Sequence, residues 1–141
     1  NIALSSVDAI ASLQEAALLL LAEIIDEIVA VMNENRISTW IDVHNIRVID
    51  YAGFYHIDCH LTVPFYLSVN EGHEILESMT TMLRIHFDDK VEFFIHIDGC
   101  MPFSCEICTI EPCEKRQAPF KEKLAWTMEN VLANTKHHLH Y

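Results

Sequence analysis

Residues 42–64 read DVHNIRVIDYAGFYHIDCHLTVP and decide the fold of this chain. Apolar and polar side chains alternate along this stretch with a period of two, which is typical of β-strands that bury one face. Ala52 and Gly53 stand between two runs of β-branched and aromatic residues, where a short hairpin turn fits. Pro64 closes the second run because proline has no backbone N–H to offer a neighbouring strand. The stretch therefore predicts two antiparallel strands.

A helix is expected on each side of this hairpin. The helix before it has an apolar stripe at helical spacing, and Gln14 is an alternative break point within it. The stripe consists of Ile24, Ile25, Ile28, Val29, Val31 and Met32. After the hairpin, Ser68 and Glu71 form a capping box that opens a helix running to about Arg84.

A third strand and an extension follow. Residues 91–98 alternate again, so the order of elements is α-β-β-α-β. Beyond them a cysteine-rich loop runs to Pro119, and the last segment predicts a helix. The apolar positions of that helix are Leu124, Met128, Val131 and Leu132. We expect an α+β fold in two parts: a helical lead-in and compact domain over residues 1–98, and a Cys-rich extension with a terminal helix over residues 99–141.

Composition narrows the class of partner. The 141 residues include 9 Lys and Arg against 21 Asp and Glu, a net charge of −12 that repels phosphate backbones and attracts cations. We therefore expect no nucleic-acid partner. Acidic residues interrupt the longest apolar stretch, residues 16–30, so we expect no direct membrane insertion by this chain. It begins at Asn1 instead of Met, which suggests a piece of a longer protein. Five cysteines, an odd number, favour a reducing compartment over a disulfide framework.

Polar residues are concentrated on one face of the second and third strands. His56, Asp58 and His60 point to one side of the second strand, because successive strand residues face opposite sides. His96 and Asp98 share the polar face of the third strand. Imidazole together with carboxylate is a ligand set that suits zinc and its first-row neighbours. The pattern favours a metal site on this face of the sheet.

Four segments, in order, carry a family resemblance: VHNIRV (43–48), IDCHLTV (57–63), NEGHE (70–74) and IHID (95–98). Over about residues 26–100 the chain resembles the cytosolic C-terminal domain of the cation diffusion facilitator transporters. The resemblance implies a ferredoxin-like, metallochaperone-like αββαβ sandwich that forms a homodimer and binds divalent metal at and near the subunit interface. Carried over residue by residue, it implies metal ligands at His44, His60, His73, His96 and Asp98.

The function that this resemblance implies is metal-sensing regulation of divalent-cation efflux, with Zn²⁺ as the expected ion. The domain would act on the cytoplasmic side of a membrane, with a second copy and the transmembrane domain of the same parent chain as partners. We expect no enzymatic turnover, because the sequence has no HExxH motif, nucleophile elbow or glycine-rich phosphate loop. A free-standing metallochaperone or metal-storage protein is the alternative, and a binuclear metallohydrolase is a more remote one.

The cysteine-rich loop has the spacing Cx4CxxCx4C, formed by Cys100, Cys105, Cys108 and Cys113. Four thiolates could close a second, tetrahedral metal site for zinc or another soft metal. Two disulfides, or unligated thiols packed under the last helix, are alternatives. An iron–sulfur cluster is a further alternative, although the spacing matches neither common ferredoxin pattern.

Residues beside these candidates have expected roles too. Cys59 is expected in the core, since it faces away from its neighbour His60. His56 and Asp58 are expected on an ordinary solvated face, with orientation of a ligating imidazole as the alternative. Arg47 is expected to form an ion pair or hydrogen bond within the fold. The terminal histidines are expected at a frayed end, and they are His137, His138 and His140.

Overall fold

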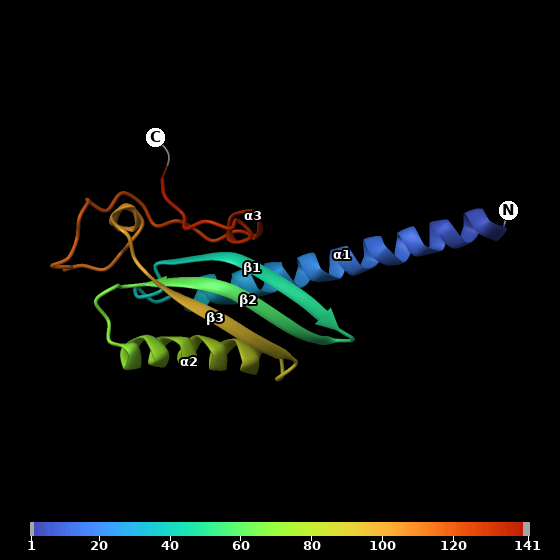
Figure 1. Ribbon diagram of the computed structural model, residues 1–141, viewed down its shortest axis with the longest axis horizontal. Coiled ribbons are helices and arrows are strands. Elements are labelled where there is room, and N and C mark those ends of the chain that lie inside the picture. The colour runs from blue at the N-terminus through green and yellow to red at the C-terminus, as the bar shows by residue number, and fades with distance from the viewer. Residues whose placement is uncertain (1, 140–141) are drawn as a thin grey trace.

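The computed structural model describes residues 2–139 and contains a three-stranded sheet with two long helices (Figure 1). Its elements, in chain order, are α1 (Ile2–Asn35), β1 (Asp42–Tyr51), β2 (Phe54–Val63), α2 (Val69–His86), β3 (Val91–Gly99), the 3-10 helix η1 (Pro102–Glu106) and α3 (Met128–Val131). In Figure 1 the C-terminal extension lies on the opposite side of the sheet from α2. The predicted α-β-β-α-β order is confirmed.

The strands lie in the order β1-β2-β3, with β1 and β2 antiparallel and β2 and β3 parallel. The chain turns from β1 to β2 at Ala52 and Gly53, whose φ angles of 55° and 91° are both positive, as a two-residue hairpin turn requires. The Gly53 N–H donates to Asp50 Oδ1 at 2.8 Å and closes the turn. Helix α2 forms the crossover between the parallel strands. This arrangement confirms the predicted αββαβ sandwich.

One face of the sheet is apolar and packs against both long helices. Ile57, Cys59 and Leu61 of β2 are buried there, together with Ile28 of α1 and Met79 of α2. Burial raises the pKa of the Cys59 thiol to about 12, so this group stays protonated and acts as a small core residue. The prediction that Cys59 belongs to the core is confirmed.

A bulge in β1 separates its two halves. The pairing with β2 shifts register between His44 and Arg47, and Asn45 adopts a left-handed conformation with φ at 53°. The Asn45 N–H therefore points away from β2 and donates to the carbonyl of Ala133 in the extension at 2.8 Å. As a result, Val43 and Ile46 both reach the apolar core although they are three residues apart.

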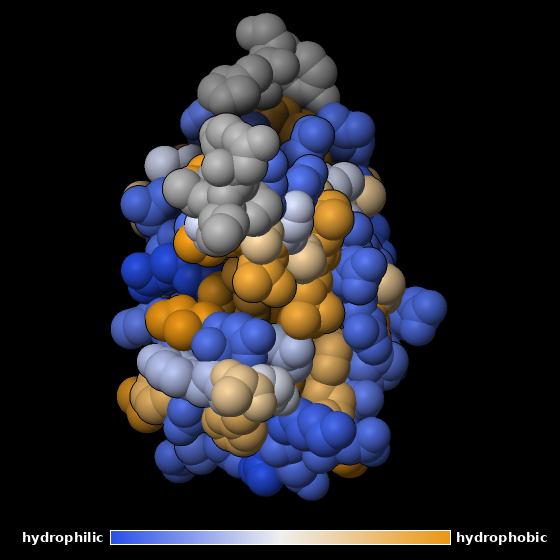
Figure 2. All heavy atoms as spheres, turned by 90° about the vertical axis from the view of Figure 1, so that its right-hand side faces the viewer, coloured by the Kyte–Doolittle hydropathy of each residue, from blue (hydrophilic) through white to orange (hydrophobic). Residues whose placement is uncertain are grey.

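Helix α1 is continuous over Ile2–Asn35, so the alternative break at Gln14 is wrong; glutamine is a good helix former. Only the part of α1 from Ile24 onward joins the core. Earlier turns expose apolar side chains, including those of Val7, Ile10, Leu13, Leu18 and Leu19. Figure 2, seen from the end where α1 begins, shows hydrophobic side chains gathered along the middle of this face. Within residues 2–139, no helix combines the length and the apolar character that a bilayer crossing requires.

Polar contacts tie the extension to the end of α1. Arg36 stacks on the Trp126 ring, 3.8 Å from its centroid, and donates to the carbonyl of Leu124 at 2.6 Å. The Asn33 side chain donates to Trp126 O at 2.8 Å and accepts from Trp126 N at 3.3 Å. Because these contacts use the backbone groups that a helix would need, the predicted terminal helix is a single turn that begins at Met128. The prediction that it includes Leu124 is wrong.

Candidate metal centre

The polar face of the sheet brings three side chains together from three strands. His44 of β1 pairs with His60 of β2, and Asp98 of β3 pairs with Thr62 of β2, so all three ligand candidates project from the same face. One ligand atom from each of His44, His60 and Asp98 lies within 4.8 Å of the other two. A single ion could bind all three after small side-chain adjustments. We call this set the His44–His60–Asp98 group.

Distances within the group indicate which atoms face the shared space. Asp98 Oδ2 lies 3.0 Å from His60 Nδ1 and 3.8 Å from His44 Nε2. The rings of His44 and His60 are 5.0 Å apart and tilted by 33°. An ion held by these atoms would replace the proton that His60 and Asp98 share. Two imidazole nitrogens with one carboxylate oxygen form a donor set that suits zinc and its first-row neighbours.

His44 is the most buried member of the group, with 5% of its surface exposed. Burial lowers the pKa of His44, and the nearby charge of Asp42 only partly opposes this effect. The ring therefore stays neutral at neutral pH, which is the form that binds metal. Its Nδ1 has no hydrogen-bond partner among residues 2–139 and faces Asp42 Oδ2 at 3.9 Å. Nε2 is thus the nitrogen of His44 that is available to an ion beside Asp98.

Asp42 and His137 stand behind His44, and neither was predicted as part of the site. Asp42 is 1% exposed; its Oδ2 accepts from the His137 backbone N–H at 2.8 Å, and its Oδ1 lies 2.5 Å from His137 Nδ1. The hydrogen bond that the His137 ring donates to Asp42 raises the pKa of His137. These contacts hold the terminal segment against β1, so the predicted frayed end is wrong at His137. His140 lies outside the described residues.

The other two predicted histidines, His73 and His96, are not members of the group. The His96 ring stacks on the His60 ring at 5.0 Å with an angle of 18° between their planes, but His96 is exposed and outside the compact set. His73 is exposed on α2, the helix that covers the apolar face of the sheet. The sheet therefore separates His73 from His60. Within one chain, three of the five predicted ligands converge, a fourth adjoins them, and the fifth does not.

Comparison with known proteins places this fold and site in a family. A family model described as "Cation efflux protein, cytoplasmic domain" matches residues 20–100, more than half of the chain. The chain belongs to this family. The match confirms the resemblance seen in the sequence, and it spans all five predicted His and Asp ligands. The extension beyond Cys100 lies outside it. A comparison with curated protein sequences gave no match.

Solved structures resemble this cation efflux domain. One structure of CzrB, described as a candidate zinc transporter, is 20% identical with a TM-score of 0.52, covering 56% of this chain and 95% of that one. A zinc form of CzrB is 21% identical with a TM-score of 0.51, covering 55% and 85%. The metal-bound C-terminal domain of the CzcD transporter from Thermotoga maritima is 25% identical with a TM-score of 0.47, covering 52% and 84%. The CzrB likeness supports the fold assignment.

A separate polar network occupies the far end of the cation efflux domain's polar face. His56 Nδ1 lies 3.1 Å from Glu92 Oε2, and its Nε2 lies 3.2 Å from Asp58 Oδ1. The hydrogen bond with Glu92 raises the pKa of His56, and the bond with Asp58 adds to it. Arg47 Nη2 reaches Asp58 Oδ2 at 3.5 Å, which confirms the predicted ion pair. His56 and Asp58 form hydrogen bonds and ion pairs with these surface partners. Within residues 2–139, no hydrogen bond joins them to the His44–His60–Asp98 group.

The cysteines of the extension gather in one place beyond β3. All five cysteines of the chain are free thiols, so the alternative of two disulfides is not what the structure contains. Cys108 is buried and Cys105 is half-buried. A metallochaperone needs exposed CxxC thiols to transfer metal to a partner, so this arrangement differs from that alternative. Cys100 and Cys113 are also half-buried, and all four line the same cavity.

Proposed function

We propose that this cation efflux domain is a metal-sensing, dimerising regulator of a divalent-cation efflux transporter. The observation that carries the proposal is the His44–His60–Asp98 group, in which ligand atoms from three strands lie within 4.8 Å of one another. Three protein ligands leave one position of a tetrahedral ion open, for water or for a group from another subunit. A site of this kind can bind its ion in exchange with the cytosol and report its concentration.

Zinc is the ion that the donor set supports best. Two imidazoles and a carboxylate match zinc coordination, whereas magnesium and calcium prefer sites built from oxygen alone. The neutral state of His44 also favours a transition metal, because no proton has to leave this ring before it binds. A zinc form of the related CzrB domain is known, which is consistent with this choice.

The regulatory step we propose is closure of a homodimer around the metal. Each chain carries a net charge of −12, so two metal-free copies repel one another. The edge strand β3 carries His96 in an exposed position beside His60, and His73 is exposed on α2. Metal bound at these positions between two copies would cancel charge and add bonds that the copies share. His73, His96 and the His44–His60–Asp98 group together form the proposed ligand set.

The energy needed for such closure is within reach of a few metal–ligand bonds. A ligand shifts an equilibrium only by its preference for one state, and about 5.5 kcal/mol of preference takes a population from 1:99 to 99:1. The closed dimer would then act on the transmembrane domain of the same parent chain, from the cytoplasmic side of the membrane. In this proposal the zinc ion is the transported substrate and also the signal.

The test is a zinc titration that follows stoichiometry by calorimetry and the separation of two protomers by fluorescence transfer. The wild type should bind zinc and bring the protomers together. A His60→Ala, Asp98→Ala double variant should lose at least about 10- to 100-fold in affinity, since even the loss of outer ligand-orienting groups costs that much. The same variant should also lose the metal-dependent approach of the protomers.

The matched control is His56→Ala, which removes a histidine from the same face of β2 but from a separate network. This variant should titrate like the wild type. Unchanged zinc affinity and stoichiometry in the double variant would show that the His44–His60–Asp98 group is not the site. Zinc binding in the wild type with no change in protomer separation would refute the closure step.

A further inference from the structure

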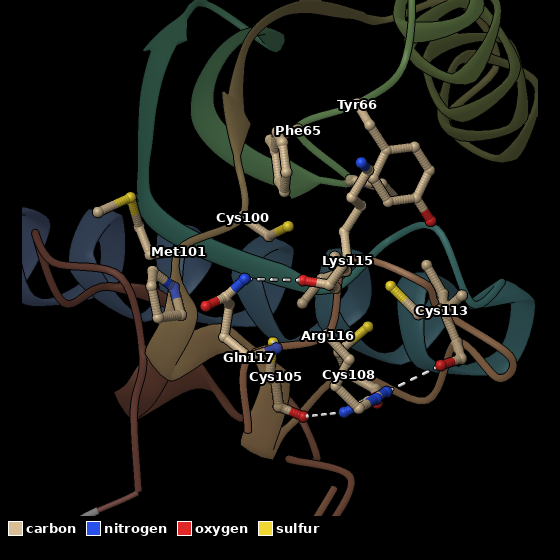
Figure 3. Close-up of a pocket in the computed structure, with 14 residues that line it drawn as sticks. Phe65, Tyr66, Cys100, Met101, Cys105, Cys108, Cys113, Lys115, Arg116 and Gln117 are labelled. Carbon is tan, nitrogen blue, oxygen red and sulfur yellow. Dashed lines mark hydrogen bonds between the residues drawn. The ribbon is translucent and has the colours of Figure 1, made fainter. Parts of the chain in front are cut away.

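Four cysteines of the cation efflux domain surround one cavity beyond the end of β3, and Figure 3 shows their sulfur atoms around a common space. Cys100 follows β3 directly, Cys105 lies in η1, and Cys108 and Cys113 follow in the loop. The cavity has a volume of about 220 Å³. A single water molecule needs only about 10–15 Å³ of such space, so the cavity can hold a group much larger than one ion.

The four thiols are set too widely for one tetrahedral ion. Metal–sulfur bonds of about 2.3 Å place four thiolates on a zinc ion about 3.8 Å from one another. Across residues 2–139, the set of ligand atoms that meets a 4.8 Å limit is the His44–His60–Asp98 group, and no three of these cysteines form such a set. A cluster of several iron and sulfide ions binds thiolates that stand further apart, because the cluster itself fills the space between them.

The loop that carries the thiols is held in place from within. Arg116 Nη1 donates to the carbonyl of Cys105 at 2.7 Å, and its Nη2 donates to the carbonyls of Cys108 and Ile110 at 2.9 and 2.8 Å. One guanidinium thus fixes the backbone at two of the four cysteines. Its positive charge also lies beside sulfur atoms that would be negative when they bind metal, in a chain that is otherwise strongly acidic.

The surroundings suit a cluster in two further ways. The backbone N–H of Gln117 points at Cys105 Sγ at 3.3 Å, and hydrogen bonds of this kind to cluster sulfurs tune iron–sulfur centres. Apolar and aromatic side chains, including Phe65 and Tyr66, line part of the cavity, and Lys115 and Arg116 add positive charge to its lining, which suits an anionic cluster (Figure 3). Burial raises the pKa of the Cys108 thiol, so ligation would release a proton from it.

We propose that Cys100, Cys105, Cys108 and Cys113 hold an iron–sulfur cluster in this cavity. The first three cysteines have the C-x4-C-x2-C spacing of plant-type ferredoxins, and the fourth follows after only four residues. The short spacing before the fourth cysteine is the reason why the four cysteines together fit neither common ferredoxin pattern. Ligation is a ligand exchange: each cysteine S–H bond breaks as its sulfur bonds to an iron of the assembled cluster, the small thiolate that held that iron leaves and takes up the proton, and no oxidation state changes.

The test uses the whole chain, reconstituted with ferric iron, sulfide and a small thiol as reductant and temporary iron ligand, in the absence of oxygen. The wild type should show visible sulfide-to-iron charge-transfer absorption and contain iron and acid-labile sulfide in equal amounts. Cys100→Ser and Cys108→Ser, made separately, should lose most of the absorption and of the sulfide. Cys100 is only half-buried, so its variant tests the site even if Cys108→Ser fails to fold by circular dichroism.

Two controls separate this site from the others. Cys59→Ala removes the cysteine that lies in the sheet core, outside the cavity, and should keep the full absorption. The His60→Ala, Asp98→Ala variant should also keep it, so failure of the proposed zinc site leaves this result intact. Wild-type protein that takes up no sulfide under these conditions would overturn the proposal. Retention of iron and sulfide in both serine variants would overturn it as well.

Discussion

Asp42 is a carboxylate with almost no exposure to solvent, and such a group is costly to bury without donors. His137 supplies two of them, its backbone N–H and its ring, and the His44 ring lies on the other side at 3.9 Å. At 3.9 Å the Asp42 carboxylate does not hydrogen-bond to His44 Nδ1, but its negative charge favours a cation at the other nitrogen of this ring. Asp42 therefore links the position of the terminal segment to the chemistry of the His44–His60–Asp98 group.

Replacing Asp42 by alanine should weaken both folding and metal binding. His137 would lose its acceptor in a largely buried place, so we expect the free energy of unfolding to fall by about 1–3 kcal/mol in urea denaturation. Zinc affinity, measured by calorimetry, should fall about 10-fold because the site loses a nearby negative charge. Asp26→Ala, at an exposed position of α1, is the control and should change neither quantity. Equal zinc affinity in Asp42→Ala and the wild type would contradict this electrostatic role.

The positions of some site residues could be predicted from the sequence, and those of others could not. His60 and Asp98 could be placed on a shared face, because strand alternation alone determines which side each occupies. The contact between Asp42 and His137 joins residues 95 positions apart, and no local pattern predicts it. A histidine near the end of the chain was the one visible signal for this contact, and it was interpreted as fraying.

Among the secondary-structure elements, strand β1 requires a left-handed residue at its bulge. Asn45 has a φ of 53°, a conformation that asparagine and glycine tolerate and that β-branched residues rarely adopt. We expect Asn45→Val to lower the free energy of unfolding by about 1–3 kcal/mol more than Asn45→Gly does, measured by urea denaturation. The valine variant should also bind zinc less tightly, since the bulge adjoins His44. Similar stability of the two variants would show that the left-handed conformation is not required.

The capping box makes the stability of α2 depend on pH. Hydrogen bonds with Ser68 lower the pKa of Glu71 below its ordinary value of 4.5. Because the folded pKa is depressed, the contribution of Glu71 is present above pH 4.5 and is lost as the pH falls through the folded pKa. Unfolding measured over a pH series should therefore show a shallower acid-side loss of stability in Glu71→Gln than in the wild type. Superimposable acid limbs would count against this coupling.

Helix and strand boundaries were predictable where the signal is local. The capping box at Ser68 and the turn at Ala52 and Gly53 each depend on neighbouring residues, and both are as predicted. The last helix was overestimated because its apolar spacing is helical, whereas Asn33 and Arg36 bind the backbone of residues 124–126 from outside. Competition of this kind comes from tertiary contacts, which a periodic pattern does not contain.

For the molecule as a whole, the exposed part of α1 contributes little to the fold. Residues 6–20 are exposed, and the core begins at Ile24. Removing residues 1–20 from this chain should change the free energy of unfolding by less than about 0.5 kcal/mol in urea denaturation. Light scattering should show less self-association, because exposed apolar side chains are removed. A control truncation through Ile28 should destabilise the fold strongly, and a similar loss for both would refute the prediction.

The candidate site was only partly predictable from the sequence, because its predicted ligands do not all lie on the same sheet. Three ligands converge because one sheet carries them in register, and the sequence predicted that sheet. His73 and His60 lie on elements separated by the sheet itself, so a single chain does not unite them. The family resemblance implies all five ligands at once, and in the proposed dimer a second copy would bring His73 to the metal.

Gly99 is the one residue between Asp98 and Cys100, at the end of β3. Its surroundings are close-packed, since a side chain at this position would meet Phe65 Cβ at 3.0 Å. The backbone just after it is also held, because the Cys100 N–H donates to Val63 O at 2.9 Å. A zinc ion bound by Asp98 and an iron–sulfur cluster bound by Cys100 would therefore both restrain the backbone of residues 98–100. Thermodynamic reciprocity then requires that whatever one occupant does to the affinity of the other is returned in equal measure. Under the two proposals together, metal sensing by this domain would respond to iron supply as well as to zinc.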